Sequence, residues 1–169
     1  MKTFWGVAEN TPLGSVWVAA SELGLLAVQI GGELDSFSQG LIARFGILPI
    51  NDKIQTANFV DQIQAYLLGE LKSFDIQIQW GTMSKFQQKS LQAVCRISYG
   101  ETRTYGQIAA EIGVPRAPRA VGRANATNPM PLVIPCHRLV GVDGSLRGYG
   151  GGEGIETKRC LLALERSHV

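Results

Sequence analysis

The residues best suited to chemistry lie together in the second half of the chain. Cys136, His137 and Arg138 follow one another directly after a run of proline, asparagine and apolar residues, 128–135. The thiolate is the nucleophilic form of cysteine, and a nearby imidazole or guanidinium lowers the pKa of a thiol. The pattern therefore predicts a cysteine nucleophile at position 136 with a depressed pKa. A buried, unreactive thiol is the alternative.

The candidate base is His137, because the other of the two histidines, His168, lies next to the C-terminus. Adjacent residues of an extended strand point to opposite faces. Cys136 and His137 can therefore act together only if the chain turns at this point or a water molecule bridges them. By the logic of catalytic triads, His137 also needs an acceptor that orients its ring.

The other two cysteines, Cys95 and Cys160, lie within apolar helical patterns and are predicted to be buried packing thiols. The chain has no C-x-x-C pair, and its two histidines and three scattered cysteines do not match the spacings of zinc sites. The sequence therefore predicts no metal site.

The composition indicates a folded globular protein. Hydrophobic residues make up 45% and charged residues 18% of the 169 residues, which excludes a long disordered chain and a coiled coil. No apolar run is long enough for a transmembrane helix, and residues 1–6 lack the apolar region of a secretory signal. With an odd number of cysteines, these features predict a cytoplasmic protein with reduced thiols.

The charges are distributed unevenly along the chain. Residues 1–82 carry four basic and eight acidic side chains, whereas residues 83–169 carry twelve basic and six acidic ones. A basic half is what a polyanion-binding surface needs. Because the balance changes at 81–83, the sequence predicts an N-terminal domain over residues 1–82 and a C-terminal domain over residues 83–169.

The first half is predicted to form a sheet with helices. Short runs rich in Val, Trp and Ile are separated by turn residues, which is typical of strands. Two other segments carry apolar residues at helical spacing. The expected strands are Phe4–Ala8, Ser15–Ala20, Leu25–Ile30 and Phe74–Trp80, and the expected helices are Leu34–Phe45 and Ala57–Leu68.

The second half is predicted to be mostly helical, with Ser84 capping its first helix and Thr104 capping its second in a capping-box pattern with Gln107. A glycine-containing turn between two short helices is the outline of a helix-turn-helix. The first expected helix starts after Ser84 and ends at Tyr99–Glu101. The other expected helices are Thr104–Ile112, Ala117–Ala126 and about Ile155–Arg166.

The second helix of this motif consists almost entirely of small residues and two arginines, Arg119 and Arg123. Ala and Gly leave a smooth face that another backbone can approach closely. Two interpretations stay open: a helix packed tightly into the core, or a helix laid into a nucleic-acid groove with one arginine reaching in. The glycine-rich segment 141–152 lacks the order of a phosphate-binding loop and is expected to be a hairpin turn followed by a mobile pocket wall.

The motif Pro135–Arg138 resembles that of the O6-alkylguanine-DNA alkyltransferases, also called methylated-DNA–protein-cysteine methyltransferases. The resemblance is strong over about residues 86–165 and weaker before them. Further matches occur in the same order as in the family: Gly100-Glu101, Thr104-Tyr105, Arg119–Gly122, Asn128-Pro129, Tyr149–Gly151 and Leu161–Glu165. The resemblance implies an α+β fold: a small N-terminal three-layer, ribonuclease-H-like supporting domain with a β-sheet and helices, followed by a mostly helical domain with the helix-turn-helix.

The resemblance also implies a chemistry. Cys136 would accept the alkyl group of O6-alkylguanine, and also of O4-alkylthymine, irreversibly and once per protein. His137 would remove the thiol proton through a bridging water, Glu165 would orient His137, and Asn128 would brace the turn that carries Cys136. No cofactor would be needed. Relatives that bind zinc do so in the N-terminal domain, where this chain has neither Cys nor His.

The implied partner is double-stranded DNA containing an alkylated guanine, bound by a monomer without a membrane. The helix-turn-helix would enter the minor groove and the lesion would be flipped out of the duplex. Arg119 would fill the gap, Tyr105 would help to hold the base, and the Leu139 carbonyl, Tyr149 and the Gly150 N–H would contact it. The implied DNA-binding residues are Thr104, Tyr105, Arg119, Gly122 and Arg123.

Two other functions compete with this one. A lesion sensor of the same fold would flip the damaged base and recruit repair proteins without transferring the alkyl group, although relatives of that sort replace the cysteine that this chain retains. A thiol hydrolase would use Cys136, His137 and Glu165 over many turnovers, but it would leave the basic half and the helix-turn-helix without a purpose.

Overall fold

The computed structural model describes residues 2–169, which divide into two compact units, residues 2–82 and Met83–Val169. The division falls where the charge balance along the chain changes sign. Within the described range, no helix has both the length and the apolar character needed to cross a membrane.

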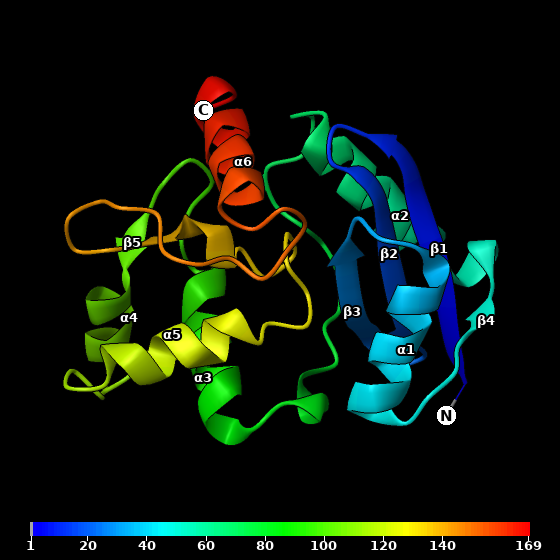
Figure 1. Ribbon diagram of the computed structural model, residues 1–169, viewed down its shortest axis with the longest axis horizontal. Coiled ribbons are helices and arrows are strands. Elements are labelled where there is room, and N and C mark those ends of the chain that lie inside the picture. Colours follow the sequence, from blue (N-terminus) through cyan, green and yellow to red (C-terminus); the bar gives the residue numbers. More distant parts are fainter. Residues whose placement is uncertain (1) are drawn as a thin grey trace. The chain divides into compact units, whose positions relative to one another are not determined.

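The first unit is built on a four-stranded mixed sheet (Figure 1). Its strands are β1 (Thr3–Thr11), β2 (Gly14–Ser21), β3 (Gly24–Ile30) and β4 (Ile50–Asn51), in the order β3-β2-β1-β4. The first three form an antiparallel meander, and β4 pairs in parallel with β1. The three predicted strands of this meander are confirmed, and each extends beyond its predicted bounds. The two-residue strand β4 was not predicted.

One face of the sheet packs against α1 (Leu34–Phe45), whose predicted bounds are confirmed. Trp17 on β2 stacks on Phe37 of this helix with ring centroids 6.2 Å apart, and Trp5 on β1 lies 5.7 Å from Trp17. Ala19, on the same face, joins Phe37 and Leu41 in a buried cluster. This face supplies the apolar core between the sheet and α1.

The other face packs against α2 (Lys53–Leu67). Gly6 marks the closest approach, since a Cβ atom built on it would lie 2.3 Å from the Thr56 hydroxyl oxygen. Side chains alternate between the two faces of a strand, so Gly6 faces α2 while its neighbour Trp5 faces α1. The unit therefore has three layers: helix, sheet and helix.

Two predictions for this unit are wrong in detail. Helix α2 begins four residues before the predicted start, because Asp52 caps it by accepting from the N–H groups of Ile54 and Gln55. The segment Phe74–Trp80 alternates as predicted but is not a strand. It pairs only around Leu25, where the Leu25 N–H donates to the Gln77 carbonyl, and it leads into a 3₁₀ turn, η1 (Trp80–Thr82).

The second unit is mostly helical (Figure 1). Its helices are α3 (Lys85–Cys95), α4 (Tyr105–Glu111), α5 (Pro118–Ala126) and α6 (Ile155–Ser167). A 3₁₀ turn, η2 (Cys136–Arg138), leads into β6 (Leu139–Val140), which pairs in parallel with β5 (Arg103–Thr104). Together the two units give the α+β fold that the sequence predicts.

The helix-turn-helix consists of α4, a turn and α5, as predicted. Thr104 accepts from the Gln107 N–H while the Gln107 side chain accepts from the Thr104 N–H, so the capping box is present. Gly113 lies in the turn with φ of +82°, a left-handed conformation that favours glycine. Pro118 occupies the first turn of α5, where its missing N–H costs no hydrogen bond.

The first helix of this unit ends earlier than predicted. Ser84 caps α3 as expected, but the helix ends at Cys95, and Tyr99–Glu101 forms a separate turn with Gly100 at φ of +78°. The predicted burial of Cys95 and Cys160 is wrong, since both residues are exposed. Their apolar neighbours in the sequence face the core, while the cysteines lie on the outer sides of their helices.

Candidate active site

The segment that carries the predicted nucleophile is buried over residues 129–141. Its apolar side chains, among them Met130, Leu132 and Ile134, lie in the core. The chain then turns at η2, where the Arg138 N–H donates to the Pro135 carbonyl. Cys136 and His137 therefore lie on a tight turn and not on an extended strand, which satisfies one of the two conditions for their cooperation.

Asn128 holds this segment and contacts the sulfur. Its side-chain Nδ2 donates to Cys136 Sγ at 3.1 Å and to the Ile134 carbonyl at 3.0 Å. Its Oδ1 accepts from the Met130 N–H at 2.9 Å. The Asn128 amide thus holds the main chain of this segment at Met130 and at Ile134, and it gives the Cys136 thiol a hydrogen-bond donor. Cys136 itself is only 7% exposed.

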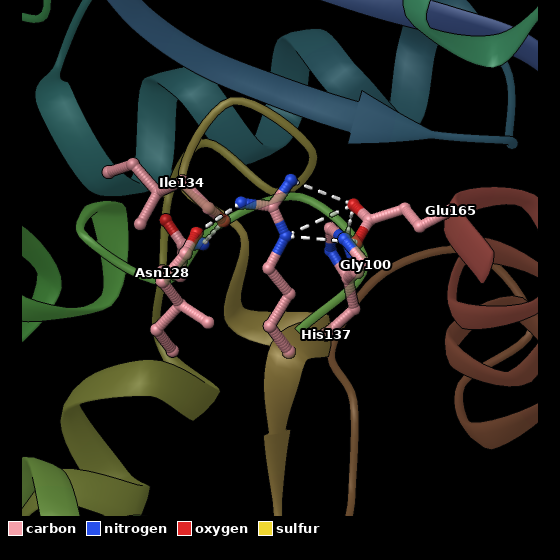
Figure 2. A network of polar contacts seen from close by, with 7 residues as sticks. Gly100, Asn128, Ile134, His137 and Glu165 are labelled. Atoms are coloured by element: carbon pink, nitrogen blue, oxygen red, sulfur yellow. Dashed lines mark hydrogen bonds and ion pairs between the residues drawn. The ribbon is translucent and has the colours of Figure 1, made fainter. Parts of the chain in front are cut away.

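His137 and Glu165 form a buried pair between η2 and α6. His137 Nε2 lies 2.8 Å from Glu165 Oε1, and both side chains are fully buried (Figure 2). A carboxylate can only accept, so Nε2 must carry the proton and Nδ1 is the basic nitrogen of the neutral ring. The Tyr149 ring stands edge-on to the imidazole at 6.5 Å between centroids.

Glu165 has further donors that the sequence reasoning did not assign. Arg138 donates from Nε to both carboxylate oxygens and from Nη2 to Oε1, and the Gly100 N–H donates to Oε2 at 3.0 Å. Arg138 Nη1 also donates to the Ile97 carbonyl at 2.6 Å. This network fixes the carboxylate in one orientation. Arg138 was visible in the motif, but its partner could not be identified without the fold.

The predicted depression of the Cys136 pKa is wrong. Burial raises the pKa of this thiol, and the hydrogen bond from Asn128 and the charge of Lys158 lower it by less. The motif suggested that Arg138 and His137 would act on the sulfur, but Arg138 is bound to Glu165. Burial lowers the pKa of His137, and Glu165 only partly offsets this effect. The resting site therefore holds a thiol beside a neutral imidazole.

Lys158 is a second functional candidate that the sequence reasoning missed. It is fully buried on α6, its ammonium donates to the Arg147 carbonyl at 3.2 Å, and it lies 6.0 Å from the centre of the Tyr105 ring. Burial lowers its pKa, and the charge on Cys136 raises it. The sequence could have predicted that Lys158 faces inward, because its spacing places it on the same helical face as Leu161, Leu162 and Glu165.

A cavity of about 1010 Å³ lies beside these residues in the second unit. Among the residues predicted to bind DNA or the base, most line this cavity: Thr104, Tyr105, Arg119, Gly122, Tyr149 and Gly150. Leu139 is buried in β6, and Arg123 lines a smaller cavity of about 530 Å³ with Ser84 and Gln87. Burial and, to a lesser extent, the charge of Cys136 raise the pKa of the Tyr105 phenol in this cavity.

Helix α5 combines the two interpretations that the sequence left open. Val121, Ala124 and Asn125 are buried, and Asn125 donates to Ser90 on α3. Arg119 and Arg123 are exposed on the other side. Gly122 lies between these faces, with a built Cβ at an ordinary 3.8 Å from the Tyr105 ring. The helix therefore packs on one face and leaves a small-residue face with two arginines exposed.

The glycine-rich segment forms a wall of the large cavity but not a hairpin. The Gly141 N–H donates to the Ser145 carbonyl, and Asp143 accepts from the Ser145 N–H and hydroxyl. No strand pairs after this turn among the residues described, so the hairpin prediction is wrong. Gly150 comes close to α5, since a Cβ on it would lie 3.2 Å from the Ala126 carbonyl.

Over residues 2–169, no group of three or more His, Cys, Asp and Glu side chains is placed to hold a metal ion.

Comparison with known proteins places both units. Residues 4–80 match the ribonuclease-like domain of 6-O-methylguanine DNA methyltransferases, and residues 85–167 match the DNA binding domain of the same proteins. A crystal structure of Mycobacterium tuberculosis OGT in complex with DNA matches with a TM-score of 0.82 and 37% sequence identity. This match covers 98% of the present chain and 94% of that chain.

Curated relatives agree with these matches. The methylated-DNA–protein-cysteine methyltransferase of Mycolicibacterium paratuberculosis is 52% identical over 112 residues, which is 66% of each chain. The protein of the same name from Mycobacterium leprae is 48% identical over 128 residues, 75% of this chain and 74% of the relative. The alignment with the first of them therefore spans just under two thirds of that relative's length.

Proposed function

Because the chain belongs to the O6-methylguanine DNA methyltransferase family, we propose that it repairs DNA by transferring the alkyl group from O6 of an alkylated guanine, or from O4 of an alkylated thymine, to Cys136. The observation that carries this proposal is the arrangement around the sulfur. Asn128 donates to Cys136 Sγ, and the next residue, His137, is held by the buried Glu165. A thiol, a neutral imidazole and a fixed carboxylate are the parts that a cysteine nucleophile needs.

The chemical step begins with the proton of the thiol. The neutral His137 takes this proton at Nδ1 through a water molecule, and Glu165 stabilises the resulting imidazolium from the Nε2 side. The thiolate then attacks the alkyl carbon: the S–C bond forms, the C–O6 bond breaks, and its electron pair stays with the guanine. The departing base takes up one proton, so normal guanine and an S-alkylcysteine result.

Two neighbours favour the charged form of the sulfur while it exists. The Asn128 amide and the Lys158 ammonium both lower the pKa of Cys136 against the effect of burial. The thiol is protonated at rest, so it becomes a nucleophile when His137 removes its proton. Lys158 would also act on Tyr105, since its ammonium lies 6.0 Å from the phenol ring.

The lesion must leave the duplex to reach this site. O6 of a stacked guanine faces the major groove, whereas a small-residue helix such as α5 fits closely into the narrow minor groove. Rotating the nucleotide out costs a few kcal/mol of unstacking, which Arg119 offsets by filling the gap. The cavity of about 1010 Å³ is large enough for an alkylated base.

The residues that line the cavity have separate roles in this proposal. Tyr105 holds the flipped base and crowds its phosphate, while Tyr149 and the Gly150 N–H meet the base near O6. The Leu139 carbonyl accepts from the guanine amino group. Thr104, Gly122 and Arg123 contact the DNA around the helix-turn-helix. The product is a thioether without a good leaving group, so each protein acts once. In this proposal the protein acts as a monomer and without a cofactor.

The test is the mass of the protein after mixing with a duplex that contains one O6-methylguanine. We expect one added methyl group per chain, located on Cys136 by peptide mapping, and none on a Cys136→Ser variant that still binds the duplex. Lesion binding by the unaltered protein without any mass change would assign the chain to the lesion sensors and refute the proposal. Repeated turnover of an ester or amide substrate without a one-equivalent limit would indicate a hydrolase.

A further inference from the structure

One charged side chain in the large cavity has no role in the mechanism above. Arg147 lies in the segment between β6 and α6 and lines the cavity together with Tyr105 and Tyr149. Its side chain is 61% exposed. Its main chain, by contrast, is fixed, because the Arg147 carbonyl accepts from the buried Lys158 ammonium at 3.2 Å. The guanidinium of Arg147 is thus exposed to solvent, while its main chain is held at the cavity wall.

The guanidinium of Arg147 is only weakly engaged within the protein. Its Nη2 lies 3.6 Å from Asp143 Oδ2, and both side chains are well exposed. Exposed pairs of this kind contribute little and exchange readily with other partners. Asp143 is also occupied by Ser145, whose N–H and hydroxyl donate to its Oδ1. An anion in the cavity can therefore take the place of Asp143.

The guanidinium of Arg147 lies against the wall of the cavity. A Cβ built on Gly141, another residue of the cavity wall, would lie 3.0 Å from Arg147 Nε, so the side chain folds back across the wall. Tyr105 lines the same cavity. Burial and the charge of Cys136 raise the pKa of its phenol, and the charge of Arg147 lowers it.

The charged side chains that line the cavity are all positive. Its lining within the described residues includes Arg119 and Arg147 and no acidic side chain. Arg119 is assigned to the gap that the flipped base leaves in the duplex. Arg147 is therefore the cation available to the base itself or to the group attached to it.

We propose that Arg147 makes this protein selective for O6-alkylguanines whose alkyl group carries a carboxylate, such as O6-carboxymethylguanine, over neutral adducts of the same size. This inference rests on the proposed function. A thiolate that attacks a carbon next to a carboxylate meets like-charge repulsion, and a guanidinium on that carboxylate removes it. The planar guanidinium also matches the two carboxylate oxygens, which a lysine cannot do as well.

The reaction is the one already described, with a different alkyl group. The Cys136 sulfur bonds to the methylene carbon, and the bond from this carbon to O6 breaks. S-carboxymethylcysteine forms, and the guanine leaves with the electron pair and takes up one proton. The carboxylate keeps its charge throughout, so its contact with Arg147 persists from the bound adduct to the product.

The experiment compares single-turnover rates on three duplexes that are identical except for the lesion. These carry O6-carboxymethylguanine, its neutral isostere O6-carbamoylmethylguanine, or O6-methylguanine. In the unaltered protein we expect the carboxymethyl adduct to react about tenfold faster than the carbamoylmethyl adduct, as a charge-assisted hydrogen-bonded pair allows. In Arg147→Gln this ratio should fall to about one or below, with the methyl rate within about twofold of its original value.

Two further variants complete the test. Asp143→Asn removes the weak partner of Arg147 and should increase the ratio. Arg116→Gln removes an exposed arginine that does not line the cavity and should leave the ratio unchanged. The other anion within reach is a DNA phosphate. If Arg147 binds phosphate, Arg147→Gln slows all three adducts equally and weakens the salt dependence of binding, and this result overturns the inference. Absence of methyl transfer by the unaltered protein would refute the proposed function instead.

Discussion

Replacing Arg138 by methionine tests the central network of the site. The side chain makes three of the hydrogen bonds that Glu165 receives and a fourth to the Ile97 carbonyl, all in a buried setting. Methionine keeps much of the volume but removes the cation. Breaking a buried ion pair in this way typically costs about 3–5 kcal/mol, because the remaining charge is left without its partner. In a chain of this size the loss corresponds to a fall in Tm of roughly 10 °C.

The same substitution should change the pH dependence of alkyl transfer in a defined direction. The charge of Arg138 lowers the pKa of His137. Without that charge the pKa of His137 rises, so the base is lost to protonation at a higher pH. The acid limb of the single-turnover rate, measured with O6-methylguanine duplex from about pH 5 to pH 8, should therefore move toward neutral pH. Arg138→Lys is the matched control, because it retains the charge while losing the paired geometry.

The two readouts separate chemistry from packing. If Arg138→Met lowers Tm but leaves the acid limb where it was, Arg138 only stabilises the fold, and the assignment of His137 as the base coupled to Glu165 is wrong. If the acid limb moves in Arg138→Met and stays in Arg138→Lys, the charge of Arg138 controls the strength of the base. Rates are compared well below the Tm of each variant, so that unfolding does not contribute.

Three other predictions follow from the same structure. Lys158→Met removes a buried charge, so it should leave Tm equal or higher while slowing alkyl transfer to Cys136. Circular dichroism melts and single-turnover rates measure these two effects, and a lower Tm with unchanged transfer would contradict the prediction. The pKa of His137 is held below the ordinary value of 6.5, so below that pH the unfolded chain binds a proton that the native chain does not, and stability should fall with falling pH. His137→Gln should flatten this decline in urea melts, and an unaltered slope would count against the buried neutral ring. Gly6→Ala should destabilise the first unit by about 1–3 kcal/mol in urea melts, because the added Cβ would meet the Thr56 hydroxyl. An unchanged midpoint of the urea transition would show that α2 can move away.

The local parts of the fold could be predicted from the sequence. Ser84 and Thr104 cap their helices through hydrogen bonds to residues three positions away, and such short-range patterns are visible in the chain itself. Pairing between distant segments is not visible in this way. Strands β4, β5 and β6 have two residues each, too few to show alternation, and Phe74–Trp80 alternates without pairing along its length. Tertiary contacts decide these cases.

The site shows the same division between local and distant information. The motif 135–138 predicts a nucleophile and a base at adjacent positions, whereas Glu165 entered only through the resemblance to the family. The error on the pKa of Cys136 has a physical cause. Neighbours in the sequence were taken as neighbours of the sulfur, but on the 3₁₀ turn Arg138 reaches Glu165, and the cation that acts on the sulfur is Lys158, twenty-two residues later.

In the proposed mechanism, the charges of the site balance only while the Cys136 thiolate exists. At rest the Arg138 cation is matched by Glu165, while Cys136 and His137 are neutral. Lys158 forms no ion pair with a carboxylate among residues 2–169, and the contribution that raises its pKa is the charge of Cys136. A buried lysine without a counterion is costly, so its retention needs a compensating gain. That gain arises if the opposing charge is the thiolate, which exists from the removal of the proton until the S–C bond forms. Under the proposed mechanism, the buried position of Lys158 is therefore explained by a short-lived state of Cys136 and not by the resting fold.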